Sequence, residues 1–195
     1  MSKRVILVTG TPCVGKTTLA RYLAKDLDAA YVNLTALAEK EHLLLNEDKK
    51  RQTKVVNEEK MRRKLRKIID KAEDSTVIID GHYAAAVTPK SRVTHVFVLR
   101  RNPVELRNFM EKNSFQGLKL WENLASEILD VCLVEAVRSH GKEKVCELDV
   151  TGKTVGAVAD EVMTLLGNRK KCRVGDVDWL GMLEAEGTLS EYLRV

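Results

Sequence analysis

The chain has 195 residues, of which 44% are hydrophobic and 31% are charged. This size suits one α/β domain with a buried core, and the composition excludes collagen-like and acidic disordered proteins. The formal net charge is +5, but residues 49–71 hold eleven Lys or Arg against three Asp or Glu, so the basic excess lies in that one stretch.

Neither a membrane span nor a cysteine framework is visible in the sequence. No apolar run approaches the roughly 18 to 20 residues that cross a bilayer. The cysteines Cys13, Cys132, Cys146 and Cys172 are scattered, with no C-x-x-C pair. We therefore expect free thiols without disulfides, in a cytoplasmic protein that does not contact membranes.

Short apolar runs alternate with helical periodicity along residues 1–167. The run VILV at 5–8 is typical of a buried strand, and leucines at 19, 23 and 27 recur at helical spacing. Strands are predicted over 4–9, 30–33, 76–80, 93–99 and 144–148, and helices over 16–27, 34–45, 53–72, 103–112, 118–139 and 155–166. This alternation predicts an α/β fold with a parallel sheet that helices cover on both faces.

Two further segments do not belong to this alternation. Residues 46–53 are polar and are predicted to form a loop. Residues 168–195 begin with a basic run and continue as an amphipathic tail that carries Trp179. We interpret them as a C-terminal extension, which either docks on the core or binds a partner.

Residues 10–17, GTPCVGKT, match the phosphate-loop pattern G-x-x-x-x-G-K-[ST] without a mismatch. Such a loop curls backbone N–H groups around a phosphate, its lysine reaches the β- and γ-phosphates, and its threonine hydroxyl can ligate Mg²⁺. We therefore predict a site for ATP and Mg²⁺ that contains Gly10, Pro12, Cys13, Val14, Gly15, Lys16, Thr17 and Thr18. Because Cys13 lies near a helix N-terminus, we also expect its thiol to have a lowered pKa.

Asp80 and His82 follow the predicted strand 76–80. An acidic residue in this position reaches the magnesium shell in phosphate-loop enzymes, although it can also simply cap a strand. His82 lies on the same side as Asp80 if the chain stays extended, where it could orient water or substrate. Packing or plain exposure is the alternative for this histidine. The candidate catalytic residues are Lys16, Asp80 and His82, and the candidate metal ligands are Thr17 and Asp80.

Together with the phosphate loop, the segments Tyr31-Val-Asn33, Asp80-Gly-His82 and Trp121-Glu-Asn123 resemble the adenylate kinase isoenzyme six family. This is the coilin-interacting nuclear ATPase of eukaryotes and its archaeal counterparts, and the resemblance covers residues 4–166. It implies a doubly wound P-loop kinase fold with five parallel strands in a domain of residues 1–167. It also implies a monophosphate lobe near 33–60 and a lid near 107–120.

The resemblance also implies an activity. The expected reaction is ATP-dependent phosphoryl transfer to AMP, with accompanying ATPase activity and a role in maturation of the small ribosomal subunit through a small-subunit ribosomal protein. This sequence departs from the family at Cys13, where glycine is usual, and at Asn57, where aspartate is usual. In the lid it retains Arg107, a predicted nucleotide contact, but has Phe109 and Asn113 where arginines are usual.

Two alternatives to a simple AMP kinase stay open. One is an ATP-switched ribosome assembly factor with little kinase activity, and the other is a kinase for another small acceptor. The basic helix predicted over 53–72 could contact an RNA backbone, although a solvated face is the more common role of such a run.

Overall fold

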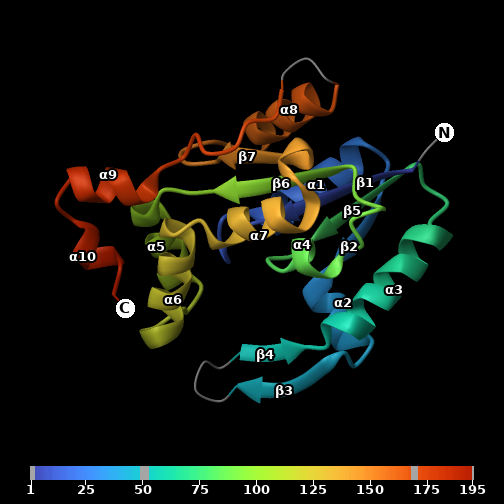
Figure 1. Cartoon of the computed structure of the whole chain (residues 1–195), viewed down its shortest axis with the longest axis horizontal. Coiled ribbons are helices and arrows are strands. Elements are labelled where there is room, and N and C mark those ends of the chain that lie inside the picture. The colour runs from blue at the N-terminus through green and yellow to red at the C-terminus, as the bar shows by residue number, and fades with distance from the viewer. Residues whose placement is uncertain (1–2, 49–52, 168–170, 195) are drawn as a thin grey trace.

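The computed structural model describes residues 3–48, 53–167 and 171–194. Its centre is a five-stranded sheet in the order β2-β5-β1-β6-β7, in which every neighbouring pair is parallel (Figure 1). The strands are β1 Arg4–Thr9, β2 Ala30–Asn33, β5 Thr76–Asp80, β6 His95–Arg100 and β7 Val145–Asp149. The helices are α1 Lys16–Asp26, α2 Leu34–Lys40, α3 Glu58–Lys71, α4 Ala84–Val87, α5 Pro103–Lys112, α6 Gly117–Ile128, α7 Val131–His140, α8 Val155–Leu166, α9 Trp179–Ala185 and α10 Leu189–Tyr192.

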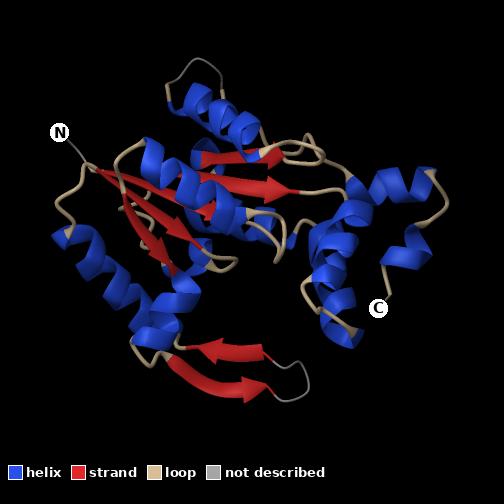
Figure 2. Cartoon of the chain, turned by 180° about the vertical axis from the view of Figure 1, so that it is seen from behind, coloured by secondary structure: helices blue, strands red, loops and turns tan. Residues whose placement is uncertain are grey.

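Helices cover both faces of this sheet, which confirms the predicted doubly wound α/β fold. Successive side chains of a strand point to opposite faces. In β1, Ile6 and Val8 therefore pack with α1 and α8, whereas Val5 and Leu7 pack with α3, α4 and α7. Helix α7 lies in front of the sheet in Figure 1, and α1 lies in front of it in the reverse view of Figure 2. Burial on both faces explains why the strands read as continuous apolar runs.

The predicted helix over 34–45 is wrong in its second half. Helix α2 ends at Lys40, since His42 adopts a φ of 52°, in the left-handed region that a right-handed helix cannot contain. The chain continues as β3 (Leu44–Asp48), which pairs antiparallel with β4 (Thr53–Val56). The loop predicted over 46–53 is thus partly strand, and 49–52 lie outside the described residues.

Two other predicted helices differ from those in the structure, one at its start and one in its middle. The helix over 53–72 begins only at Glu58, because β-branched residues of 53–56 form β4 and Asn57 accepts a capping hydrogen bond from the Lys60 amide at 3.0 Å. The helix over 118–139 breaks between α6 and α7, where Asp130 has a φ of 58°. Its carboxylate is held by Arg100 at 2.5 Å.

The expectation of free thiols is wrong for one pair of cysteines. Cys146 on β7 and Cys172 form a disulfide, with their Cα atoms 4.6 Å apart. The pair shows no sequence signal because the C-terminal segment returns along β7, where the Glu147 amide donates to the Arg173 carbonyl at 3.0 Å. Cys13 and Cys132 are free.

The C-terminal extension docks on the core through α9 and α10. Trp179 and Leu183 of α9 are buried. Beyond α9, Arg194 stacks over the Trp121 ring of α6 at 3.9 Å from the ring centroid. None of the helices in the described part of the chain has the length and hydrophobicity that a membrane crossing requires.

Candidate functional site

The phosphate loop joins the end of β1 to the start of α1 at the carboxyl edge of the sheet. Gly10 has a φ of 136°, and a Cβ there would lie 2.5 Å from the Leu99 carbonyl oxygen, so a side chain does not fit. Gly15 precedes α1 with a φ of 107°. The predicted nucleotide-binding residues 10 and 12–18 thus surround the N-terminus of α1, whose dipole favours a bound phosphate.

Lys16 is the first residue of α1, and its ammonium folds back over the loop. Its Nζ donates a hydrogen bond to the Thr11 carbonyl oxygen at 2.8 Å. Burial lowers the pKa of Lys16, while nearby groups that include the Asp80 carboxylate act to raise it. A phosphate anion beside Lys16 would favour the charged form of its side chain.

Cys13 differs from the sequence-based expectation. Its φ of 69° lies in the left-handed region. Burial raises the pKa of the Cys13 thiol, and the opposing effect of the Lys16 charge is smaller. The expected lowering of this pKa is therefore wrong, and the thiol is protonated at neutral pH.

Asp80 is the meeting point of three side chains. It is 1% exposed, and its Oδ2 accepts hydrogen bonds from Thr17 Oγ1 at 2.7 Å, Tyr31 Oη at 3.0 Å and Asn33 Nδ2 at 2.8 Å. Thr17 and Asp80, predicted as partners, are therefore brought together. The contacts of Tyr31 and Asn33 depend on the pairing of β2 with β5, which places Asn33 beside Asp80 in register.

The oxygen atoms of Thr17 and Asp80 fit Mg²⁺. This ion prefers oxygen ligands and is usually held by one or two carboxylates, with water and substrate phosphates completing its shell. Within the described residues, no group of three or more His, Cys, Asp or Glu side chains could hold a metal ion by itself. Thr17 and Asp80 thus suit a cation that arrives with a nucleotide.

His82 lies beside the loop, two residues beyond Asp80. The residue is exposed, yet desolvation by the surrounding protein and the Lys16 charge lower the pKa of its imidazole to about 4. Its carbonyl oxygen accepts a hydrogen bond from Thr9 Oγ1 at 3.1 Å, and its ring packs edge-to-face on Tyr83 with centroids 4.8 Å apart. The imidazole is therefore neutral at pH 7, suited to hydrogen bonding rather than to charge neutralisation.

A cavity of about 520 Å³ extends from the phosphate loop toward the start of α8. This volume falls in the range of small-molecule sites. Its lining beyond residues 13–19 is formed by Leu99, Arg101, Phe109, Asn113, Val150, Lys153, Val155 and Val158. Arg101 and Lys153 were not predicted, because nothing in their sequence context distinguishes them from other basic residues.

The structure places Arg107 outside the residues that line this cavity. Its Nε donates to Glu111 Oε1 at 2.9 Å, and its guanidinium lies 5.2 Å from the Trp121 ring centroid and 5.9 Å from that of Tyr192. Arg101 instead faces the loop, where it contacts the Val14 carbonyl and stacks over Phe109 at 4.8 Å.

Residues 6–130 match the profile of a protein family described as an AAA domain. Over 176 residues the chain is 36% identical to a "putative adenylate kinase" of Methanocaldococcus jannaschii, covering 89% of this chain and 92% of that protein. Over 192 residues it is 35% identical to a protein of the same description from Pyrococcus furiosus, covering 98% of each chain.

Solved structures with low sequence identity share the fold. Shikimate kinase from Acinetobacter baumannii superposes with a TM-score of 0.64 at 14% identity, covering 87% of this chain and 96% of that one. Thymidylate kinase from Candida albicans superposes with a TM-score of 0.57 at 13% identity, covering 91% and 96%. At such identities the likeness concerns the fold alone.

Proposed function

Because this chain belongs to the family of archaeal adenylate kinases, as its resemblance to isoenzyme six indicated, we propose that it transfers the γ-phosphoryl group of ATP to a nucleoside monophosphate, with AMP as the preferred acceptor. The observation that carries this proposal is the Thr17–Asp80 contact at 2.7 Å, at the mouth of a phosphate loop that borders a cavity of about 520 Å³. These are the parts that phosphoryl transfer requires, since it depends mainly on positioning and charge stabilisation.

The loop and Lys16 hold the phosphates of ATP in this proposal. Backbone N–H groups of residues 13–18 surround the β-phosphate. Lys16 gives up its hydrogen bond to the Thr11 carbonyl oxygen and binds oxygens of the β- and γ-phosphates instead. Thr17 and Asp80 hold Mg²⁺, which would neutralise phosphate charge. Tyr31 and Asn33 orient the Asp80 carboxylate through its Oδ2.

His82 serves as a neutral hydrogen-bonding group in this proposal. With a pKa of about 4 it is a weak base at pH 7, so it orients a water molecule or the acceptor rather than removing a proton completely. Hydrolysis of ATP accompanies transfer when water occupies the acceptor position.

The monophosphate lobe and the lid of the kinase are proposed from the family pattern. Helix α2 and the β3–β4 hairpin form the monophosphate lobe near 33–60, while α5 and the start of α6 form the lid near 107–120. Figure 1 shows the hairpin projecting away from the five-stranded sheet. The domain then comprises residues 1–167, and 168–195 form its extension.

The decisive experiment measures ADP formation from ATP and Mg²⁺ with AMP, CMP, UMP or GMP as acceptor. We expect AMP to give the highest rate, and Lys16→Ala and Asp80→Asn to lower it by about 10³-fold or more while the proteins remain folded. Lys25→Glu, an exposed change in the last turn of α1, is the matched control. Equal rates of ADP formation with and without every monophosphate would indicate an ATPase instead of a kinase. Transfer only to another small acceptor would favour the alternative of a kinase for that acceptor.

The exposed face of α3 supports a second candidate function, contact with RNA. A hollow of about 460 Å³ on this helix is lined by Leu43 and by Lys60, Arg63, Lys64, Arg66 and Lys67. Lys64 pairs with Glu41 at 2.7 Å, whereas Arg66 and Lys67 point into solvent. A face of this charge suits a phosphate backbone. The association with a small-subunit ribosomal protein stays a prediction of the family resemblance.

Binding of a single-stranded RNA oligonucleotide at several salt concentrations tests this second function. Arg66→Glu with Lys67→Glu should weaken binding at least tenfold and flatten the salt dependence, whereas Lys25→Glu with Lys142→Glu should not. Equal losses in both double variants would indicate that only net charge matters, and would reject a specific face on α3.

A further inference from the structure

The side chain of Glu127, near the end of α6, joins three distant segments inside the core. It is 1% exposed. Its Oε1 accepts hydrogen bonds from Arg100 Nε at 2.9 Å, the Arg101 amide at 3.1 Å and Trp179 Nε1 at 3.2 Å. Its Oε2 accepts one from Thr11 Oγ1 at 2.5 Å. A buried carboxylate with four donors has one well-defined position.

Thr11 connects this carboxylate to the lysine of the phosphate loop. Thr11 is fully buried, and its hydroxyl donates its hydrogen bond to Glu127. Its carbonyl oxygen receives the hydrogen bond from Lys16 Nζ at 2.8 Å. The orientation of the Thr11 peptide, set in part by Glu127, thus decides where the Lys16 ammonium rests before nucleotide binds.

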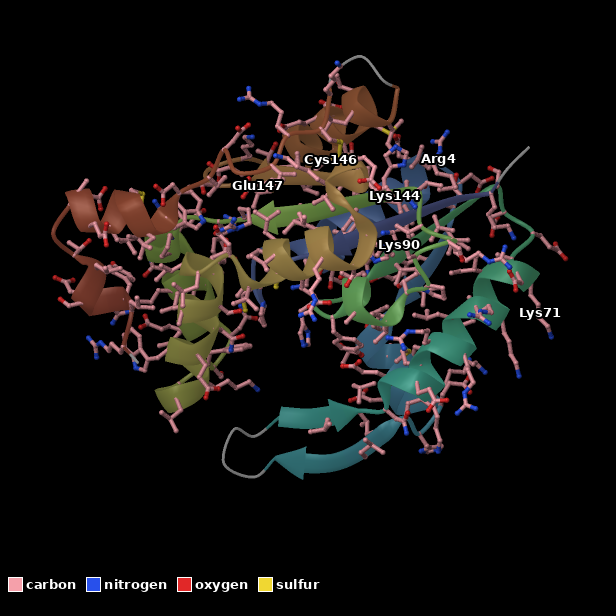
Figure 3. All side chains as sticks on the ribbon, in the orientation of Figure 1. Arg4, Lys71, Lys90, Lys144, Cys146 and Glu147 are labelled. Carbon is pink, nitrogen blue, oxygen red and sulfur yellow. A yellow bond between two sulfur atoms is a disulfide. The ribbon has the colours of Figure 1, made fainter. Side chains whose placement is uncertain are left out.

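Trp179 connects the same carboxylate to the C-terminal extension. It is 8% exposed at the start of α9, and its indole N–H points to Glu127. The segment before it is tied to β7, since the Gly175 and Asp176 amides donate to Glu147 Oε2 at 2.7 and 3.1 Å and Cys172 is bonded to Cys146. Figure 3 shows Cys146 and Glu147 as neighbours on β7.

Arg100 forms a buried ion pair with Glu127, with Nε 2.9 Å from Oε1. The Arg100 guanidinium is 1% exposed and also contacts Asp130 and Glu147, at 2.5 and 2.6 Å. Burial acts to lower the pKa of Arg100, but the carboxylates of Glu127 and Asp130 raise it above its usual value. The ion pair with Arg100 therefore helps to hold the Glu127 carboxylate in place beside Thr11 and Trp179.

We propose that Glu127 and Trp179 are positioning residues for the phosphate loop. Through them, the C-terminal extension fixes the orientation of Thr11 and thereby the position of the Lys16 ammonium. This inference rests on the proposed function, because it assigns these residues to the same nucleotide site. Neither residue is among those that line the cavity beside the phosphate loop. The extension is therefore part of the working kinase.

A double-mutant cycle between Trp179→Phe and Thr11→Val tests the connection. Trp179→Phe keeps the aromatic packing and removes the N–H, and Thr11→Val keeps the shape and removes the hydroxyl. Each should lower turnover about tenfold, the effect of a hydrogen bond to a charged group. If both act through Glu127, the double variant should be no slower than the slower single variant. Thr11→Ser should restore most of the activity, and Glu184→Gln, exposed on α9, should leave it unchanged.

Multiplied losses in the double variant, or turnover of Trp179→Phe within twofold of the unaltered chain, would overturn the inference. A structural role of Trp179 alone predicts such multiplication, because its effect would not depend on the Thr11 hydroxyl. The same cycle is run on MgADP affinity by calorimetry. A chain that binds MgADP but phosphorylates no monophosphate would contradict the proposed function. The double-mutant cycle on MgADP affinity would still decide the inference about Glu127 and Trp179.

Discussion

Single residues in the phosphate loop combine geometry and burial in ways that their residue types do not show. Gly10 and Gly15 hold positive φ angles at no steric cost, whereas Cys13 holds one with a side chain. The same burial that raises the pKa of Cys13 lowers those of Lys16 and His82. Desolvation therefore makes each of these groups less ready to ionise.

Replacing Cys13 by glycine should leave the free energy of unfolding unchanged or raise it by up to about 1 kcal/mol. A left-handed L-residue costs roughly 1–2 kcal/mol, and the extra chain entropy of glycine offsets about half of this gain. Equilibrium denaturation measures the effect. The control is Cys13→Ala, which removes the thiol but keeps the strain, and a glycine variant less stable than the alanine variant would contradict the argument.

The ring protons of His82 should titrate near pH 4 in an NMR experiment, with His82→Asn identifying the signal. The unfolded chain binds this proton below about pH 6.5, whereas the folded chain does not until about pH 4. Stability should therefore fall as the pH decreases from about 6.5 to 4. His95 and His140, whose pKa values burial also lowers, act in the same direction. A titration midpoint near 6.5 would show that His82 is solvated.

At the scale of elements, the break between α6 and α7 organises the site. Asp130, the residue before α7, lies in the left-handed region, and Arg100 at the end of β6 holds its carboxylate. The break lets α6 present Glu127 to the phosphate loop while α7 packs on the sheet. On the other side of the cavity, α5 ends at Lys112 and is followed by Asn113, so the residues at this helix end decide which groups line the cavity.

Asn113→Arg should raise AMP phosphorylation at least several-fold and change ATP hydrolysis less. Asn113 lines the cavity beside Phe109, and an arginine there could make the bidentate phosphate contact that a lysine cannot. Steady-state kinetics with and without AMP measure both activities. Lys112→Arg, one residue away and outside the cavity lining, is the control. Turnover of the unaltered chain near the roughly 10² to 10³ s⁻¹ upper range of enzymes would show that Arg101 or Lys153 already supplies this charge.

At the scale of the whole molecule, the C-terminal extension packs back on the domain that precedes it. Its contacts run from the disulfide on β7, through Trp179 beneath the phosphate loop, to Arg194 on the Trp121 ring. The guanidinium of Arg107 also lies over the rings of Trp121 and of Tyr192 in the extension. The predicted lid arginine therefore packs against the extension instead of lining the cavity.

Reduction of the Cys146–Cys172 disulfide should lower the free energy of unfolding by about 3 kcal/mol, because the bond closes a loop with a sequence separation of 26. Denaturation with and without a thiol-free phosphine reductant measures the loss. Cys172→Ser should reproduce the reduced value and become insensitive to the reductant. A reductant effect that persists in Cys172→Ser would mean that another thiol is responsible.

The sequence by itself determined the local parts of this protein. Buried strands read as apolar runs, the phosphate loop has a fixed spacing, and Asp80 marks a strand end, so the α/β fold and the Lys16–Thr17–Asp80 group could be predicted. Only the tertiary structure decided what depends on pairing between distant segments. Asn33 reaches Asp80 because β2 adjoins β5, and Cys146 meets Cys172 because the chain returns along β7. Glu127 looks like any helical glutamate until the fold buries it among four donors, since periodicity records which face of a helix is apolar but not which residue will lie opposite.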